Sequence, residues 1–510
     1  MLTTSLAFFI SVSWAFESGS AGRVEVVAPD HVRVGAQGEK DQDGRNRQAN
    51  WYSFKVDGVR PGTPVTIDLV DLPGEYNYQP NRGAVNAETP AVWSEDGRTW
   101  RHVEHFQYDP AEPGMRLRIT PRRGHFWVAH TPPYTNQHLD RLWKNVRGSF
   151  RREQIGRSVD GRPLWLWSIG TGPKTIWLMF RQHSWETGTS WTGEGAIREL
   201  ARNAALQKGY SWKILPLADP DGVARGGVRF NKYGFDLNRN WDVNGVEKMP
   251  EIAAQRKAML ASGPAALFFS LHNTETSEYL EGPPTADPAI RALGERFANA
   301  LDVRSSFAPT RPLSFAAAVA PGRMTVIHGL STDRQWPAFL MEQRISQQIK
   351  YGRRPLVEDR LRFGRELVTI MGEILQYRMA TYGLVEYDDA TDEVRALYDD
   401  IRTVRQTDYI NNFWKALAQD PATLRRTWEG VKQIMGPGGA LDPLFKEMIY
   451  IAVSATNGCG YCVASHTAGA RKAGMTPEMF GELMAVTGMA NETNRLAVGY
   501  QIPIDDRFKP

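Results

Sequence analysis

The sequence Phe-Arg-Gln-His-Ser-Trp-Glu-Thr-Gly-Thr-Ser-Trp occupies residues 180–191 and directly follows the apolar run Thr175–Phe180. That run is typical of a buried strand. His183 and Glu186 stand just past its end, where a tight loop can place both side chains on the same side. Imidazole nitrogen and carboxylate oxygen are ligands that a divalent metal ion such as Zn²⁺ accepts. The pair alone is weak evidence, because this spacing is common by chance.

The composition is that of a globular protein with several domains. The chain has 510 residues, of which 42% are hydrophobic and 23% charged, and about two to four domains are expected at this length. A net charge of +4 is small for such a chain and gives no reason to expect nucleic acid as a partner. The 2 cysteines lie close together near the C-terminus, so their role is local: redox chemistry, metal binding or none.

The N-terminal segment Leu6–Ala15 is apolar and permits two interpretations. It resembles the short core of a signal peptide. However, no Lys or Arg precedes it, and it continues into a turn and the strand-like run Val24–Val27. We therefore expect the first hairpin of the fold and a cytoplasmic protein, with an exported protein as the alternative. No stretch of the sequence is long enough to span a membrane as a helix.

Residues 1–138 predict an antiparallel β-sandwich. Short stretches alternate between apolar and polar side chains, as in Trp51–Val56, Val65–Val70 and Met115–Thr120. Pro-Gly and Asp-Gly pairs separate these stretches, which is typical of turns between strands. Two packed sheets are the usual outcome of such a pattern, and we see no cluster of catalytic residue types in this part.

From residue 139 to 384 the pattern changes to alternating strands and helices. Apolar runs predict buried strands, and segments with helical spacing lie between and after them. The strands are expected at Leu164–Ile169, Thr175–Phe180, Ser211–Leu217, Ala265–Leu271 and Ala338–Met341, and the helices at Gly193–Leu206, Ala289–Leu301 and Glu358–Tyr377. This alternation indicates an α/β domain with a mixed sheet, whose chemistry is expected at the strand ends.

Residues 385–510 are predicted to be almost entirely helical. Amphipathic spacing is found at Thr391–Val404, Asp408–Leu417, Pro421–Met435 and Leu444–Thr456. We therefore predict a multidomain protein in three parts: a β-sandwich over residues 1–138, an α/β domain over 139–384 and an all-α domain over 385–510.

Candidate site residues follow the predicted strands of the middle domain. Besides His183 and Glu186, the later strands lead into His272 and Glu342. Two histidines and one glutamate can hold Zn²⁺ and leave a position open for water. A separate glutamate can then take a proton from that water. A zinc hydrolase needs such a set.

A long motif between these strands adds arginines to the set. Residues 219–223 are Asp-Pro-Asp-Gly-Val, Arg229 follows, and residues 234–241 are Gly-Phe-Asp-Leu-Asn-Arg-Asn-Trp. Arginines can hold a carboxylate with two hydrogen bonds and stabilise a developing oxyanion. Together with the candidates above, this series resembles that of the zinc carboxypeptidases of the carboxypeptidase A type. The preceding sandwich, with Trp-Tyr-Ser-Phe at 51–54 and Ala-His-Thr-Pro-Pro-Tyr-Thr at 129–135, resembles the cytosolic carboxypeptidase subfamily.

The resemblance covers about residues 5–380 and implies a metal site. His183, Glu186 and His272 would bind Zn²⁺. Asp236 would hydrogen-bond His183 and thereby fix the tautomer of its imidazole.

The resemblance also implies a set of residues that act on the substrate. Asn238 and Arg239 would hold the carboxylate at the substrate's C-terminus. Arg229 would polarise the scissile carbonyl and stabilise the oxyanion, and Glu342 would be the general base and then the proton donor to the leaving amine. Apart from the resemblance, we predict that Arg334 favours acidic C-terminal residues, because it lies between Val319 and Leu340, the segment expected to line the specificity pocket.

Two positions depart from the family pattern. Asp219 stands where the family more often has Asn, and no tyrosine lies between Tyr279 and Tyr351. The family's substrate-covering tyrosine therefore has no position that the sequence identifies.

Each candidate also has an ordinary structural interpretation. His272 alone would be a core histidine, Arg229 a surface charge, and Glu342 the partner of Arg344 or Arg353 in a salt bridge. These alternatives lose weight because all the candidates occur together in one ordered series.

The two cysteines form a Cys-x-x-Cys motif at Cys459 and Cys462, with Glu447 before it and His466 after it. A helix N-terminus lowers the pKa of one thiol in such a motif. A histidine one turn later can shuttle the proton, and a glutamate can orient it. A zinc site with two Cys and one His is the alternative, but a fourth ligand is lacking nearby.

This pattern resembles the AhpD-like proteins of the carboxymuconolactone decarboxylase family over about residues 390–510. The resemblance implies an all-helical domain, a redox-active pair at Cys459 and Cys462, and a homo-oligomer. The family often has a histidine just before the second cysteine, where this chain has Tyr461, so the proton relay would differ.

The sequence therefore predicts a metallocarboxypeptidase that acts on the C-termini of peptides or proteins, fused to a thiol-redox domain. The expected cofactor is Zn²⁺, and no nucleic acid is expected as a partner. The alternative is a thiol-dependent peroxide- or disulfide-handling protein whose peptidase portion mainly binds. A zinc-dependent binding module is disfavoured, because a general base and an oxyanion arginine are both predicted.

Overall fold

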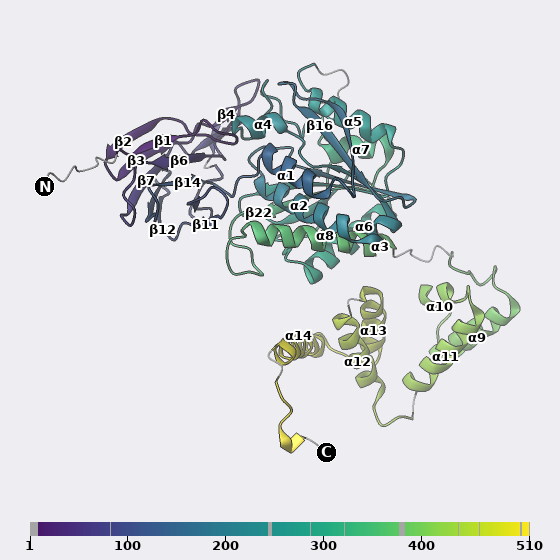
Figure 1. The fold of residues 1–510 in the computed structure, drawn as a ribbon. Coiled ribbons are helices and arrows are strands. Elements are labelled where there is room, and N and C mark those ends of the chain that lie inside the picture. The colour runs from purple at the N-terminus through teal and green to yellow at the C-terminus, as the bar shows by residue number, and fades with distance from the viewer. Residues whose placement is uncertain are drawn as a thin grey trace. The chain divides into compact units, whose positions relative to one another are not determined.

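The computed structural model in Figure 1 describes residues 9–81, 83–242, 247–285, 287–320, 322–376, 383–436, 438–457, 459–499 and 502–508. The chain divides into two compact units, Met1–Tyr377 and Arg378–Pro510. The multidomain fold class predicted from the sequence is confirmed. The bounds of the three predicted domains stay predictions.

Two five-stranded sheets form the N-terminal sandwich. In sheet order, the first is built from β1 (Ser11–Ser13), β6 (Ser53–Asp57), β14 (His125–Ala129), β10 (Val92–Ser94) and β11 (Arg101–His102), and the second from β12 (His105–Asp109), β13 (Gly114–Ile119), β7 (Val65–Val70), β3 (His31–Gly35) and β2 (Val24–Ala28). One pair, β3 and β7, is parallel. Alternate side chains such as Phe54, Val56 and Ile67 fill the space between the sheets.

The apolar N-terminal run contributes a strand to this sandwich. Ser11–Ser13 pairs with β6 in antiparallel register. The expected first hairpin is wrong, because β2 lies in the other sheet and pairs with β3. Residues 1–8 lie outside the described residues. No helix in the described part of the chain combines the length and the apolar character needed to cross a membrane.

A small four-stranded sheet was not predicted. It consists of β4 (Glu39–Lys40), β5 (Arg47–Gln48), β8 (Gly74–Tyr76) and β9 (Gln79–Asn81). Strands of two or three residues, nearly all of them exposed or partly exposed, have no apolar alternation that a pattern could detect.

The middle part contains an eight-stranded mixed sheet. Its order is β15 (Arg151–Arg157), β16 (Pro163–Ile169), β18 (Tyr210–Leu215), β17 (Lys174–Phe180), β19 (Leu267–Thr274), β22 (Ala338–Arg344), β20 (Tyr279–Gly282) and β21 (Ser314–Phe315). The four strands β18, β17, β19 and β22 run parallel to one another. Such central strands are buried on both faces, which explains why their sequences are continuous apolar runs.

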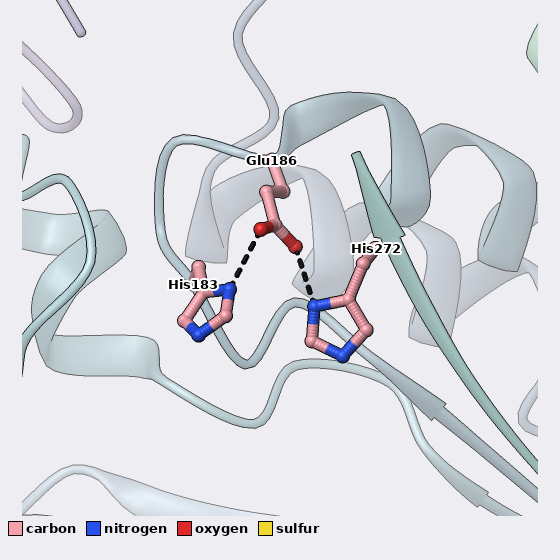
Figure 2. A group of neighbouring side chains, drawn as sticks. All are labelled: His183, Glu186 and His272. Carbon is pink, nitrogen blue, oxygen red and sulfur yellow. Dashed lines mark hydrogen bonds and ion pairs between the residues drawn. The ribbon is translucent and has the colours of Figure 1, made fainter. Parts of the chain in front are cut away.

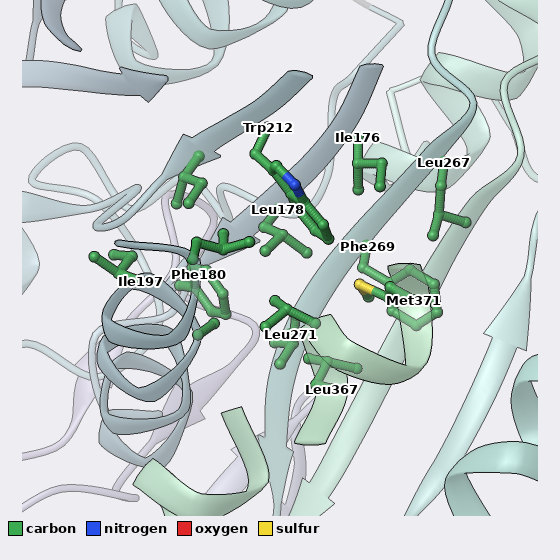
Figure 3. Close-up of a cluster of buried hydrophobic side chains, with 14 of the residues drawn as sticks. Ile176, Leu178, Phe180, Ile197, Trp212, Leu267, Phe269, Leu271, Leu367 and Met371 are labelled. Atoms are coloured by element: carbon green, nitrogen blue, oxygen red, sulfur yellow. The ribbon is translucent and has the colours of Figure 1, made fainter. Parts of the chain in front are cut away.

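Helices cover both faces of this sheet. Those of the first unit are α1 (Asn136–Val146), α2 (Thr187–Arg202), α3 (Ala204–Gly209), α4 (Pro220–Arg225), α5 (Pro250–Ala261), α6 (Pro288–Arg304), α7 (Val326–Arg334) and α8 (Val357–Gln376). One face packs Leu178, Phe180 and Phe269 against α2 and α8 (Figure 3). The other face packs Trp177 and Phe268 against α5 and α7.

Among the boundaries in this domain that differ from the prediction, three bear on the site. Helix α2 begins at Thr187, earlier than the predicted Gly193, and so directly follows Glu186. Strands β19 and β22 continue beyond their predicted ends, which places His272 and Glu342 within strands instead of after them. The strands extend because β19 and β22 pair with each other through these polar positions.

The second unit is helical, as predicted. Its helices are α9 (Asp392–Arg405), α10 (Asn412–Leu417), α11 (Pro421–Met435), α12 (Pro443–Thr456), α13 (Gly460–Lys472) and α14 (Pro477–Gly499), followed by a short 3-10 helix (Asp506–Phe508). Leu397, Tyr398 and Trp428 lie in the core that joins α9, α10 and α11. The homo-oligomer expected from the sequence stays a prediction.

Candidate active site

Three side chains converge at the carboxyl ends of β17 and β19. The Glu186 carboxylate lies between two imidazoles: Oε1 is 2.6 Å from His183 Nδ1, and Oε2 is 3.0 Å from His272 Nδ1 (Figure 2). The three ligand atoms lie within 4.8 Å of one another, and all three residues are buried. No other group of at least three His, Cys, Asp or Glu side chains lies so close together in the described part of the chain.

The loop that carries His183 and Glu186 is held by a buried arginine. Arg181 has a positive φ of 63°, and its guanidinium donates to the Ser184 carbonyl from Nε and Nη2, at 2.8 and 2.6 Å, and to Ser190 Oγ. These bonds span the loop from strand β17 to the first turn of α2. The short loop can therefore place both ligands on one side.

The outer nitrogens of both histidines have partners in the protein. Asp236 Oδ1 lies 3.0 Å from His183 Nε2, and Ser270 Oγ lies 3.0 Å from His272 Nε2. Gln182 Oε1 is 3.2 Å from the same His272 nitrogen and accepts a bond from Ser270. Such contacts fix ring orientation and leave Nδ1 of each ring directed at Glu186. Gln182 and Ser270 were not identified from the sequence.

Arg229 is joined to this group through Asp236. Its Nε donates to Asp236 Oδ2 at 2.8 Å, so it is not an isolated surface charge. Burial alone would raise the pKa of Asp236, but the positive charge of Arg229 and the adjacent His183 hold that pKa well below its usual range. Asp236 is therefore anionic and suited to orient both neighbours.

Glu342 lies beside the three converging residues. It pairs in register with His272 across the parallel strands β22 and β19, and with Tyr279 on β20. Residues in register on neighbouring strands share a face of the sheet. One oxygen of Glu342, Oε2, is buried and has no hydrogen-bond partner in the part of the chain that the structure describes. Burial and, next, the negative charge of Glu186 raise the pKa of Glu342 well above its usual range.

The alternative salt bridges of Glu342 are not found. Arg353 pairs with Asp359 at 2.7 Å, and Arg344 donates to backbone carbonyls. Both cations thus have other partners, and the carboxylate of Glu342 is left on the site side of the sheet.

The predicted substrate residues Asn238 and Arg239 differ in their surroundings. The Asn238 amide is buried: its Oδ1 accepts from the Val326 backbone nitrogen at 3.0 Å, and its Nδ2 is 3.4 Å from His272 Nε2. Arg239 instead lines a cavity of about 370 Å³, which is also lined by the arginines Arg45, Arg229 and Arg323 and the aspartates Asp41, Asp43 and Asp236. Arg45 is paired with Asp41 and Arg229 with Asp236, and a guanidinium group such as that of Arg239 can bind a carboxylate.

The predicted role of Arg334 in substrate preference is not supported by its position. Arg334 is exposed at the end of α7, next to the start of β22, whereas Glu342 lies towards the other end of that strand. Arg323, and not Arg334, lines the cavity described above.

A tyrosine that the sequence did not single out lies beside Glu342. This residue is Tyr279, and Arg311 is stacked 3.4 Å from its ring centroid. The sequence was searched for the family's tyrosine only after Tyr279. The pairing of β20 with β22 is therefore what shows that Tyr279 is a neighbour of Glu342.

Asp219 is buried and begins helix α4. Its Oδ1 accepts from the Gly222 backbone nitrogen at 2.8 Å, and burial raises its pKa to about 7. An aspartate can make this capping bond as well as an asparagine. The departure from the family pattern thus leaves the loop shape intact.

The cysteine motif lies at the start of α13. Cys459 and Cys462 form a disulfide, and Glu447 Oε2 lies 2.6 Å from His466 Nδ1. Tyr461 points elsewhere, because its hydroxyl accepts from the Phe413 backbone nitrogen at 3.1 Å. The structure therefore contains the predicted glutamate–histidine pair.

Comparison with protein-family models matches three parts of the chain. Residues 12–130 match the cytosolic carboxypeptidase N-terminal domain, residues 135–279 match zinc carboxypeptidase, and residues 421–502 match the carboxymuconolactone decarboxylase family. An uncharacterised protein of Zymomonas mobilis is 28% identical over 311 residues, which are 57% of this chain and 76% of that protein.

Two further comparisons concern named carboxypeptidases. Cytosolic carboxypeptidase 6 of Mus musculus is 28% identical over 258 residues, 44% of this chain and 45% of that protein, so the match spans less than half of that relative. The crystal structure of a metallo-carboxypeptidase from Burkholderia cenocepacia aligns with a TM-score of 0.64 and 21% identity over 72% of this chain and 99% of that one. The latter shows a common fold.

Residues 135–279, which contain this cluster of ligands, match the zinc carboxypeptidase family, and the fold is shared with a solved metallo-carboxypeptidase. In particular, the chain joins a cytosolic carboxypeptidase N-terminal domain to the carboxypeptidase domain and adds a C-terminal domain of the carboxymuconolactone decarboxylase family. Both resemblances inferred from the sequence are confirmed.

Proposed function

We propose that this chain is a zinc-dependent carboxypeptidase that hydrolyses the C-terminal peptide bond of peptides or proteins. The observation that carries the proposal is the in-register pairing of Glu342 with His272. This pairing sets a carboxyl group, whose Oε2 has no hydrogen-bond partner among the described residues, beside the converging His183, Glu186 and His272. A group of ligands with a separate acid–base residue is the arrangement that hydrolysis requires.

The residues present fit a zinc ion. Two imidazole Nδ1 atoms face a shared carboxylate, and their outer nitrogens are held by Asp236 and Ser270. When bound there by His183, Glu186 and His272, zinc would lower the pKa of a water molecule and polarise the scissile carbonyl.

The chain's own residues would perform the remaining steps. Glu342 would accept a proton from the attacking water and pass it to the leaving amine. Arg229, held by Asp236, would donate to the developing oxyanion. Arg239 would bind the terminal carboxylate. The buried Asn238 would orient His272 through its Nδ2 and hold the backbone of Val326 through its Oδ1. A cytoplasmic location stays a prediction.

The direct test is release of free amino acid from a dipeptide whose N-terminus is blocked. We expect release by the isolated chain, loss of at least about 100-fold on treatment with a chelator, and recovery when Zn²⁺ is added back. Treatment with the chelator already saturated with zinc is the matched control. Activity that survives complete removal of metal would contradict the proposal.

A second candidate function concerns the C-terminal domain. The specific observation is the Cys459–Cys462 disulfide at a helix start, with Glu447 bonded to His466 in the same domain. We propose that the reduced pair delivers two electrons and two protons to a hydroperoxide, which forms the disulfide, an alcohol and water. An added dithiol would then reduce the disulfide and restore the two thiols.

Peroxide turnover with an added dithiol separates the two candidates. We expect Cys459→Ser to abolish it, because the disulfide can no longer form, and Glu447→Gln to lower it by about 10- to 100-fold through the proton relay. His183→Ala is the matched control and should leave it unchanged. Turnover that persists in Cys459→Ser would eliminate the thiol function.

A further inference from the structure

A carboxylate from the N-terminal part of the chain is bonded to the segment that carries Arg229. Glu39, on β4, accepts three hydrogen bonds on its Oε2 from the consecutive backbone nitrogens of Val228, Arg229 and Phe230, at 3.0, 2.6 and 2.8 Å. Its Oε1 accepts from Arg225 Nη2 at 2.6 Å. Figure 1 shows β4 next to α4, which ends at Arg225.

The sequence before Arg229 permits this close approach. A Cβ on Gly227 would lie 3.0 Å from Glu39 Oε1 and 2.9 Å from Arg225 Nη2. Gly226 has a φ of 67°, and a Cβ there would lie 2.1 Å from the Gly19 carbonyl oxygen. Both glycines therefore leave room for the N-terminal part of the chain to lie against this turn.

The bonded segment also contacts the loop of the predicted metal ligands. The Val228 backbone donates to Glu39 and its carbonyl accepts from the Trp185 backbone nitrogen at 3.0 Å. The Ser184 hydroxyl donates to the same carbonyl. Glu39 thus lies on one side of the segment and the His183–Glu186 loop on the other.

We propose that Glu39 is a positioning residue that sets the backbone of Arg229 and thereby directs its guanidinium at the reacting carbonyl. Three amides converging on one ionised oxygen form strong, charge-assisted hydrogen bonds. The backbone of Arg229 is held by Glu39 and its side chain by Asp236. The N-terminal part of the chain would then complete the active site. The inference rests on the proposed function, because it assumes that Arg229 donates to the oxyanion that forms during hydrolysis.

Kinetics of Glu39→Gln test the link to Arg229. The amide keeps the size of the side chain but loses its charge, so we expect kcat to fall about 10- to 100-fold with KM nearly unchanged, as for loss of a transition-state interaction. In an Arg229→Ala background the same change should lower kcat less than about twofold. Glu25→Gln is the matched control, because Glu25 pairs only with Arg33 among the contacts found for it.

Two outcomes would overturn the inference. One is an unchanged kcat in Glu39→Gln. The other is an equal loss in both Arg229 backgrounds, which would indicate general destabilisation. If Glu39→Gln fails to fold, Gly227→Ala serves instead, since it keeps the carboxylate and crowds it; a smaller loss of kcat, again dependent on Arg229, is expected.

Amide hydrogen exchange gives an answer that needs no catalysis. We expect Glu39→Ala to speed exchange at the amides of residues 228–230, because their common acceptor is gone, and Glu25→Gln to leave them unchanged. Unchanged exchange in Glu39→Ala would refute the positioning role. If the unmodified chain releases no amino acid, the carboxypeptidase proposal fails, while exchange still decides whether Glu39 holds this segment.

Discussion

Glu342→Gln is expected to lower kcat for release of the C-terminal residue by about 10²- to 10⁴-fold, the range in which a general acid–base residue contributes. The amide keeps the shape of the side chain but cannot accept the proton of the attacking water. Zinc content and KM should change little, because Glu342 lies beside the converging ligands and is not among them.

The measurement is steady-state kinetics on a blocked dipeptide, with metal content determined on the same samples. Glu373→Gln is a suitable control, since Glu373 lies on α8 and pairs with Arg304 at the surface. A Glu342→Gln variant within tenfold of the unmodified chain would show that another group takes the proton.

His272→Ala is expected to weaken zinc binding by more than about 10²-fold, because loss of a residue that merely supports a ligand already costs about 10- to 100-fold. His272 faces Glu186 from β19, and the only other histidine in the group is His183. Two remaining ligands cannot hold the ion against dialysis, so metal and activity should disappear together.

Metal analysis after dialysis checks this expectation. His328→Ala is the matched control: this buried histidine on α7 is bonded to Thr325 and the Ala317 carbonyl and lies outside the group of ligands. A His272→Ala variant that retains a full equivalent of zinc would refute the proposed ligand set. Retained zinc in His272→Ala with lost activity would assign this histidine to another role.

Local sequence predicted the central sheet well. Strands β16, β17 and β18 begin and end within a few residues of the predicted bounds, because most of their side chains are apolar and buried. The helix starting at Asp392 was also expected from the amphipathic spacing of Thr391–Val404, and in the structure the Thr391 side chain caps it. The sandwich followed from alternation in strands such as β7.

Local sequence did not predict features that depend on pairing between distant segments. The strands β4, β5, β8 and β9 are too short to show a period. Arg334 was selected because it lies in a segment expected near the substrate, yet α7 turns it to the surface. Tyr279 and Glu342 are neighbours because β20 and β22 pair, and no spacing along the chain encodes that contact.

The sequence by itself determined which residue types are available and which family they resemble. The His-x-x-Glu pair after β17 and the long arginine-bearing motif can be found without any knowledge of contacts. Only the tertiary structure decided how they are used. It brought His272 to Glu186 across the parallel strands β17 and β19 and set Glu342 in register beside it. It also placed Glu39 under the backbone of Arg229. Hydrogen bonds and strand register join residues that are close in space but far apart along the chain, and the spacing of residues in the sequence does not show which of them will meet.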